Sequence, residues 1–286
     1  MGAKSGIWNQ TAMLNLNIDD CERVGMDVVR EAGRLLLERS RTEFDVSYKG
    51  TVNLVTDVDL AAEELIVSRI RKAFPGHSIL AEERHSDSTE GAVKWVIDPL
   101  DGTTNYAHGY PVFSVSIGLE VNGEVEWGAV MDPLRNEVYA ARRGRGAACN
   151  GHPLRVSGVR TLGASLLATG FPYDIRTSSL TNLDNYCAFA LRTQGVRRSG
   201  SAALDLCQVA AGRLDGFWEL KLNPWDCAAG YLMVREAGGT ITNFRGRRGS
   251  IYEKEVIASN GLIHEEMIAV LEMAGSNLES RISNCE

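Results

Sequence analysis

The chain has 286 residues, with 30 Lys and Arg against 37 Asp and Glu, a formal net charge of −7, and 44% hydrophobic residues. The acidic balance argues against a nucleic-acid-binding protein, which normally shows a basic surplus, and no apolar run approaches the ~20 residues of a membrane-spanning helix. Residues 1–17 lack the basic-then-apolar layout of a signal peptide, so the sequence predicts a cytoplasmic protein without a membrane partner.

The six cysteines show no metal-site or disulfide pattern. None forms a C-x-x-C pair, and no histidine stands at zinc-ligand spacing beside them. We therefore expect free thiols, as in a reducing compartment.

The first half of the chain alternates between helical and strand patterns. Apolar residues at helical spacing predict a helix over 19–39, capped by Asp19 or Asp20, and a second from about Asp59 to Pro75. Alternating or continuous apolar runs predict strands at 44–48, 77–83, 95–98, 112–121, 124–132 and 136–142. The turn Asn122-Gly123 is a strong hairpin signal, so the last three strands form an antiparallel meander.

From residue 165 onward strands and helices alternate. Strands are predicted at 165–170, 195–200, 216–222, 240–244 and 256–259, and helices over 182–193, 201–212, 225–237 and 261–274. We expect one layered α+β domain over 1–286, with mixed sheets covered by helices, an ordered core at about 19–274 and polar ends at 1–17 and 275–286.

Carboxylates stand just past apolar runs at four places. These are Asp57 in NLVTD, Glu82 in SILAEE, Asp98 with Asp101 in WVIDPLD, and Asp226 in NPWD. A single acid of this kind is as often a helix cap or a turn residue. Caps remain an alternative for Asp57 and Asp226, since a helical pattern follows each of them.

The segment Asp98-Pro99-Leu100-Asp101 is more specific. Pro99 fixes one backbone dihedral, and Gly102 permits a turn that other residues disfavour, so two like charges are held close together. Such carboxylates raise each other's pKa unless a cation joins them. Asp98, the Leu100 carbonyl and Asp101 therefore predict a hard-metal site, and Mg²⁺ suits it better than Zn²⁺ because His and Cys are missing from the set.

Thr103 follows this loop at the start of a predicted helix. Its backbone N–H would lack a helical partner there, and helix N-termini attract anions. A hydroxyl beside a metal can also orient a bound water. The loop thus combines a metal site, an anion site and a water-positioning group.

With these residues the chain resembles the inositol monophosphatase family of Mg²⁺-dependent, lithium-sensitive phosphatases. Two motifs carry the resemblance, WVIDPLDGTTNYAHG at 95–109 and NPWDCAAGYLMVREAGG at 223–239, with LAEE ahead of the first and GSAA between them. The match covers about residues 19–274. It implies an αβαβα sandwich and a homodimer.

The resemblance also implies residue roles. The metal ligands would be Glu82, Asp98, the Leu100 carbonyl, Asp101, Asp226 and, for a further weaker ion, Asp57. Thr103 with Glu82 would orient the attacking water, and Asp57 would assist. The substrate would contact Asp101, Gly102, Thr103, Gly200, Ser201, Ala202, Glu219 and Asp226. Five acids beside a phosphate would repel strongly, so we expect two or three Mg²⁺ ions per site.

The implied activity is Mg²⁺-dependent hydrolysis of a phosphorylated polyol, with myo-inositol monophosphate as the leading substrate. Fructose-1,6-bisphosphatase, or another sugar-phosphate phosphatase, is the enzymatic alternative. Arg197-Arg198 could hold a second phosphate, although an ion pair at a strand end is the competing interpretation. A regulatory binding protein that uses the surface of the same scaffold for a macromolecular partner is the non-enzymatic alternative.

Overall fold

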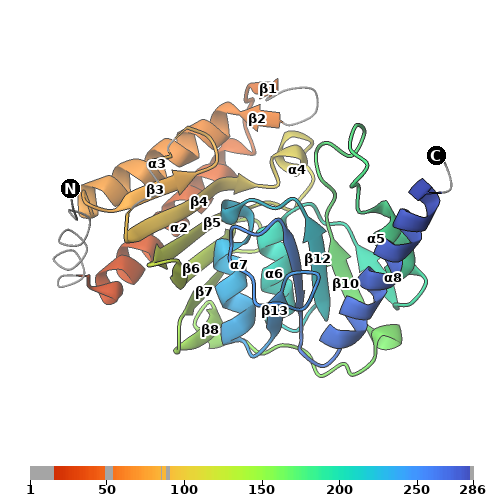
Figure 1. The fold of residues 1–286 in the computed structure, drawn as a ribbon. Helices are drawn as coiled ribbons and strands as arrows, with labels where there is room; N and C mark the ends of the chain where they lie inside the picture. The colour runs from red at the N-terminus through yellow and green to blue at the C-terminus, as the bar shows by residue number, and fades with distance from the viewer. Residues whose placement is uncertain (1–15, 49–53, 85, 88–90, 284–286) are drawn as a thin grey trace, which may run out of the picture.

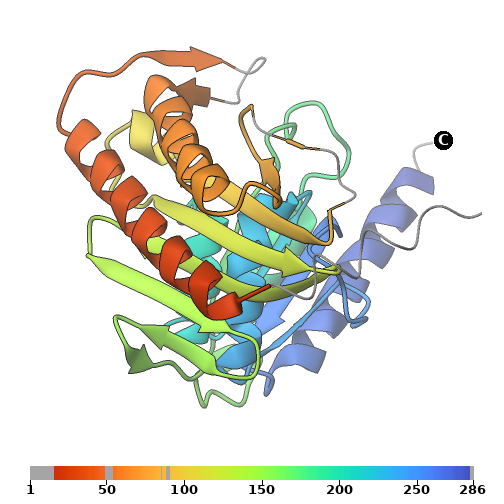
Figure 2. The ribbon, with the colours of Figure 1, turned by 90° about the vertical axis from the view of Figure 1, so that its left-hand side faces the viewer.

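The protein is built in five layers, as helices, sheet, helices, sheet, helices (Figure 1). The computed structural model describes residues 16–48, 54–84, 86–87 and 91–283. Helices α2 (Ile18–Arg39) and α3 (Asp57–Ala73) form the first layer and lie side by side against one sheet (Figure 2). Their buried faces, which include Val29, Leu36 and Ile66, pack against Trp95 and Trp127 of that sheet.

The first sheet has seven strands in the order β3-β4-β5-β6-β7-β8-β9. Strands β3 and β4 are parallel, and every other neighbouring pair is antiparallel. The Asn122-Gly123 turn between β5 and β6 has positive φ at both residues, 52° and 83°, which matches a type I′ hairpin. The strand bounds are β3 Ser78–Ala81, β4 Val93–Asp101, β5 Ser114–Val121, β6 Glu124–Asp132, β7 Glu137–Arg142, β8 Gly146–Cys149 and β9 His152–Pro153.

The second sheet has five strands in the order β11-β10-β12-β14-β13. Strand β10 is parallel to β11 and β12, and β14 is antiparallel to β12 and β13. Helices α5 (Leu183–Ala190) and α8 (His264–Ser283) cover its outer face, where Phe189 stacks near Trp218. The bounds are β10 Leu166–Thr169, β11 Gly195–Arg197, β12 Gly216–Leu220, β13 Thr240–Thr242 and β14 Glu255–Ser259.

Three shorter elements complete the described fold. Strands β1 (Val46–Tyr48) and β2 (Leu54–Thr56) form a small antiparallel pair ahead of α3. The single turns α4 (Thr103–Ala107) and η1 (Leu162–Ala164) lie in the connections that follow β4 and β9.

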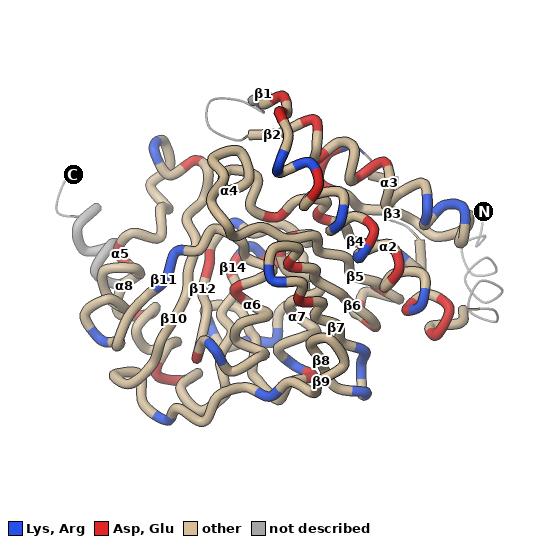
Figure 3. Tube along the Cα trace, turned by 180° about the vertical axis from the view of Figure 1, so that it is seen from behind, with Lys and Arg blue, Asp and Glu red and all other residues tan. Residues whose placement is uncertain are grey.

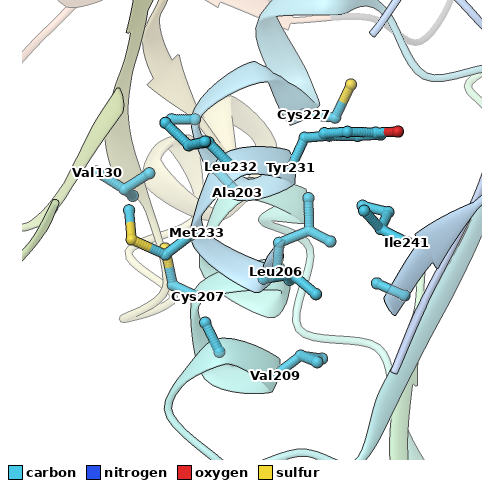
Figure 4. Close-up of a cluster of buried hydrophobic side chains, with 14 of the residues drawn as sticks. Val130, Ala203, Leu206, Cys207, Val209, Cys227, Tyr231, Leu232, Met233 and Ile241 are labelled. Carbon is cyan, nitrogen blue, oxygen red and sulfur yellow. The ribbon is translucent and has the colours of Figure 1, made fainter. Parts of the chain in front are cut away.

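Helices α6 (Ala202–Ala210) and α7 (Pro224–Glu236) fill the space between the sheets, as Figure 4 shows for their apolar side chains. Glycines let α7 approach the seven-stranded sheet closely. A Cβ added at Gly118 would lie 2.9 Å from the Ala228 Cβ, and one at Gly128 would lie 2.8 Å from the Ala229 Cα. This close contact fixes the N-terminus of α7, which carries Asp226, against the end of β4.

The layered α+β class predicted from the sequence is confirmed, but strands β2, β8 and β9 were not predicted, and several other elements differ at their ends. Helix α2 is capped by Asn17, whose side chain accepts from the Asp19 N–H, rather than by Asp19 or Asp20. Helix α8 runs to Ser283, past the expected end at residue 274. The predicted polar end at 1–17 lies mostly outside the described residues.

The surface carries both signs of charge. Figure 3 shows Lys and Arg alternating with Asp and Glu along α2 and α3. The described cysteines, Cys21, Cys149, Cys187, Cys207 and Cys227, are free thiols, as predicted, and Cys285 lies outside the described residues. Within the ranges given above, every helix is too short or too polar to cross a bilayer.

Candidate active site

The end of β4 brings the two acids of the D-P-L-D segment into the interior. The strand is buried along its whole length, and Asp98 and Asp101 are only 2% and 8% exposed. Its pairing with β5 shifts between these residues, so a bulge redirects the chain at Pro99. Asp98 Oδ1 accepts the Leu100 N–H at 3.0 Å, which makes the turn rigid, as the sequence predicted.

Gly102 connects this bulge to α4. Its φ of 96° is in the left-handed region, and an added Cβ would lie 3.0 Å from the Val112 carbonyl oxygen, so glycine is required twice over. The first hydrogen bond of α4 runs from the Tyr106 N–H to the Gly102 carbonyl, at 3.0 Å. The N–H groups of Gly102 and Thr103 precede that bond and are therefore not part of the helical ladder.

The Thr103 hydroxyl is held by a residue that sequence analysis missed. Its Oγ1 lies 2.9 Å from Asp59 Oδ1 and 3.0 Å from the Leu100 carbonyl oxygen. Asp59 is completely buried, and its other oxygen accepts from the Thr56 N–H at 2.8 Å and the Thr56 hydroxyl at 2.5 Å. A hydroxyl that donates to Asp59 keeps its lone pairs free to accept from a water.

Asp57, the acid assigned from the sequence, lies elsewhere. Its side chain is 40% exposed and pairs with Arg39 on α2 at 2.5 Å, while its second oxygen accepts the Asp45 N–H at 3.1 Å. Asp57 does not line the cavity described below. Asp59 is thus the buried acid of α3 that contacts Thr103, whereas Asp57 forms an ion pair between two helices; the metal and catalytic role expected for Asp57 stays a prediction.

Glu82 and Asp226 reach the same place from different layers. Glu82 follows β3, and its N–H donates to the Ile97 carbonyl beside it at 3.2 Å. Asp226 is the third residue of α7, where its carboxylate accepts the Asn223 N–H at 2.6 Å in a capping box. Asp226 is therefore a cap and a lining residue of the cavity at once, so the two sequence interpretations do not compete.

These acids line one cavity of about 300 Å³ between the two sheets. Burial raises the pKa of Asp98, and the carboxylates of Glu82, Asp101 and Asp226 raise it further. Burial also raises the pKa of Asp101 to about 6, against a hydrogen bond from Ser201, and that of Asp226 to about 8. The cavity thus gathers carboxyl groups that resist joint ionisation unless a cation offsets their charge.

The opposite wall comes from α6, β12 and the segment 170–174. Ser201 caps α6 and donates to Asp101 Oδ2 at 2.5 Å, and the Ala203 N–H donates to the same oxygen at 2.9 Å. Ser201 therefore positions a metal-ligand candidate, and the substrate contact expected for it stays a prediction. Glu219 on β12 faces the cavity beside Gly170, where any Cβ would collide with its carboxyl group.

Two further cavity-lining residues were not assigned from the sequence. Asp205 is buried, accepts from the Ser199 hydroxyl, and has a pKa that burial raises to about 8. Arg198 lines the cavity and lowers the pKa of Glu219, which burial and nearby acids raise. The ion pairs within 4.0 Å among the described residues do not include Arg197 or Arg198, contrary to the pairing expected at this strand end.

The donor set suits a hard divalent cation. It consists of carboxylates with a backbone carbonyl at the bulge, all oxygen atoms, which is the preference of Mg²⁺. Among the described residues no three His, Cys, Asp or Glu side chains already form a cluster able to hold an ion.

Comparisons with known proteins place this layered α+β sandwich and its acid-lined cavity in a family of phosphatases. The inositol monophosphatase family model matches residues 17–276. The chain is 45% identical over 259 residues to the Nus factor SuhB of Pseudomonas aeruginosa, covering 87% of this chain and 94% of that protein.

Two further relatives are a chloroplastic protein and a solved structure. The chloroplastic phosphatase IMPL1 of Arabidopsis thaliana is 38% identical, covering 98% of this chain and 76% of that protein. The solved inositol monophosphatase of Anabaena superposes with a TM-score of 0.83 at 40% identity, covering 90% of this chain and 97% of that one. The chain belongs to the inositol monophosphatase family.

Proposed function

We propose that this protein hydrolyses a phosphate monoester in a Mg²⁺-dependent reaction, with myo-inositol monophosphate as its substrate. The observation that carries the proposal is the convergence of Glu82, Asp98, Asp101 and Asp226 on one buried cavity. Their mutual repulsion, seen in the raised pKa of Asp98, is the electrostatic condition that divalent cations relieve. Membership of a phosphatase family supports the same reaction.

The ions would be held by Glu82, Asp98, the Leu100 carbonyl, Asp101 and Asp226. Bound Mg²⁺ supplies Lewis acidity that lowers the pKa of water and stabilises the departing alkoxide. Hydrogen bonds orient the two inner ligands in advance, since Leu100 donates to Asp98 and Ser201 to Asp101. Such supporting contacts keep the ligand oxygens aimed at the cavity.

The chain's own contribution to the attack is the pair Thr103 and Asp59. Asp59 accepts the Thr103 hydroxyl proton, which orients the Thr103 lone pairs toward the cavity. A water that donates to Thr103 Oγ1 is thereby aligned for attack on phosphorus, and its proton has a path toward Asp59. We propose Asp59 for the assisting role predicted for Asp57.

Substrate is held at both ends. The N–H groups of Gly102 and Thr103 are proposed donors to phosphate oxygens, since they precede the helical ladder of α4. Glu219 is proposed to accept ring hydroxyls, because its carboxyl group faces the cavity from β12. Gly200 and Ala202 line the same side and shape the space for the ring.

Arg198 supports the alternative substrate class. Its guanidinium lines the cavity without an ion-pair partner among the described residues, and such a group suits a second phosphate. A sugar bisphosphate therefore remains the second candidate, and replacement of Arg198 by Met distinguishes the two. The loss of kcat/KM should be large for fructose 1,6-bisphosphate and small for inositol 1-phosphate if Arg198 binds a second phosphate.

The decisive experiment measures phosphate release from inositol, sugar and aryl phosphates with and without Mg²⁺. EDTA should abolish release and added Mg²⁺ should restore it. Full activity in excess chelator would refute the metal mechanism.

The Pseudomonas relative is named a Nus factor, so we propose in addition that a macromolecular partner uses the scaffold surface. An Asp98→Asn protein that retains partner binding would separate that role from catalysis.

We also propose that the protein is a homodimer, on the strength of its family. Sedimentation equilibrium of the full chain tests this directly, and a monomer at micromolar concentration would contradict it.

A further inference from the structure

Helix α3 turns two buried acids toward the site, one helical turn apart. Asp59 holds Thr103, as described above. Glu63, four residues later and so on the same face of the helix, is 1% exposed and has no part in the proposed reaction. A carboxylate is buried this completely only where its oxygens are well satisfied, so the partners of Glu63 indicate its role.

Both oxygens of Glu63 accept backbone N–H groups of the segment that follows β3. Glu83 N–H donates to Oε2 at 2.7 Å, and Arg84 N–H donates to Oε1 at 2.8 Å. These are the two residues immediately after Glu82. One carboxylate therefore fixes two consecutive peptide groups next to a metal-ligand candidate.

These two hydrogen bonds to Glu63 lie where the chain leaves the seven-stranded sheet. The parallel pairing of β3 with β4 ends at Ala81 opposite Ile97. The Glu82 N–H still donates to the Ile97 carbonyl, at 3.2 Å, and then the chain leaves the sheet. Strand β3 is the edge strand of its sheet. Glu63 thus holds the chain from one side of Glu82, and strand β4 holds it from the other.

We propose that Glu63 is a positioning residue that aims the Glu82 carboxylate into the cavity and so sets the affinity for Mg²⁺. This inference rests on the proposed function, because it assumes that Glu82 is a metal ligand. The charged acceptor strengthens both hydrogen bonds relative to neutral ones. Loosening the segment lets Glu82 turn away, which weakens ion binding without altering Asp98, Thr103 or the substrate wall.

The test compares Glu63→Gln with two other variants of the same helix. Glu63→Gln keeps the size but presents an amide NH₂ to one of the two backbone donors. Glu63→Asp keeps the charge but shortens the side chain by one methylene, so its oxygens no longer reach both N–H groups. Ile70→Val removes a buried methyl group from α3 and serves as the control for lost stability alone.

Two readouts do not depend on activity. The first is hydrogen exchange of the Glu83 and Arg84 amides in metal-free protein, which should accelerate in both Glu63 variants. The second is the Mg²⁺ dissociation constant from calorimetric titration, which should rise by ~10- to 100-fold in both, as for other residues that orient metal ligands. With saturating Mg²⁺, kcat should return to within a few-fold of wild type, and KM for substrate should not change.

Three outcomes would overturn the proposal. A wild-type Mg²⁺ affinity in Glu63→Asp would show that the charge of residue 63 sets the affinity, and not its two hydrogen bonds to residues 83 and 84. If Ile70→Val weakens Mg²⁺ binding as much as Glu63→Gln does, the loss of affinity follows from lower stability of the protein in general. Unchanged Mg²⁺ affinity in both Glu63 variants would remove Glu63 from the site. Wild-type activity in excess chelator is a distinct result, since it refutes the proposed function and this inference together.

Discussion

The two walls of the cavity differ in how many of their polar side chains already have hydrogen-bond partners within the protein. On the wall formed by the end of β4 and the start of α4, Asp98 and Thr103 each have a protein hydrogen-bond partner at 3.0 Å or less, and the partner of Thr103 is Asp59 of α3. On the wall formed by β12, the Glu219 carboxylate makes no hydrogen bond or ion pair with the described residues, and Gly170 leaves space for this carboxyl group. The first wall is preorganised for chemistry, and the second leaves the Glu219 carboxylate available for a ligand.

The largest expected effect lies on the preorganised wall. Asp98→Asn removes a ligand charge from the bulge and should lower kcat by several orders of magnitude, because metal binding and water positioning fail together. Glu83→Gln is the matched control, since this substitution keeps the backbone N–H that donates to Glu63. Steady-state kinetics on inositol 1-phosphate measures both. Equal losses in the two variants would show that the Glu82 register is misassigned.

The second effect separates the two acids at the start of α3. Asp59→Asn should lower kcat by ~100-fold or more, as expected when a positioned proton acceptor is lost. Asp57→Asn should lower only thermal stability, by a small amount, because it breaks a half-exposed ion pair with Arg39. Steady-state kinetics and thermal unfolding, measured on both variants, distinguish the two roles. A larger kinetic loss in Asp57→Asn would restore the assignment made from the sequence.

The third effect should depend on the substrate. Glu219→Gln removes a charged acceptor worth ~1.5–3 kcal/mol to a bound hydroxyl, or roughly 10- to 150-fold in kcat/KM. An aryl phosphate without the matching hydroxyl should lose much less, and the Mg²⁺ requirement should hardly change. The variant is assayed on both substrates with Mg²⁺ titrated in each case. An equal loss on both would place Glu219 in the catalytic centre.

The smallest effect concerns stability against pH without metal. The folded-state pKa values of Asp101 and Asp226, about 6 and about 8, exceed the ordinary carboxyl value, so the folded state holds protons that the unfolded state releases. Stability in chelator should therefore fall as pH rises from about 4 toward 8, and Mg²⁺ should raise the melting temperature more at pH 8 than at pH 6.5.

An Asp226→Asn variant provides the control for this prediction, since it should flatten the upper part of the decline. His77 and His264, whose pKa values burial lowers, act in the opposite direction, but only below their ordinary value of 6.5. A melting temperature in chelator that stays level or rises between pH 6.5 and pH 8 would contradict the argument.

Local patterns predicted most elements and the inner acids, because periodicity and turn chemistry are local properties. The choice between Asp57 and Asp59 depended on helix register, which the capping box makes visible. Thr56 caps α3, so Asp59 is the third helical residue and folds back toward the cap. The spacing Thr-x-x-Asp was a usable signal. The contacts of Glu63 with residues 83–84 were not predictable, because they join segments that only the tertiary fold brings together.

Because α7 packs closely on Gly118 and Gly128, the set of acids around the cavity is completed late in folding. Asp98 and Asp101 are made early, whereas Asp226 is made long after them and reaches the cavity only when α7 docks on the sheet. Contacts between such distant segments form late in folding, since a long loop must close first. A nascent chain that lacks α7 has an incomplete set of acids. The ion binding proposed here would therefore mark molecules whose folding is finished.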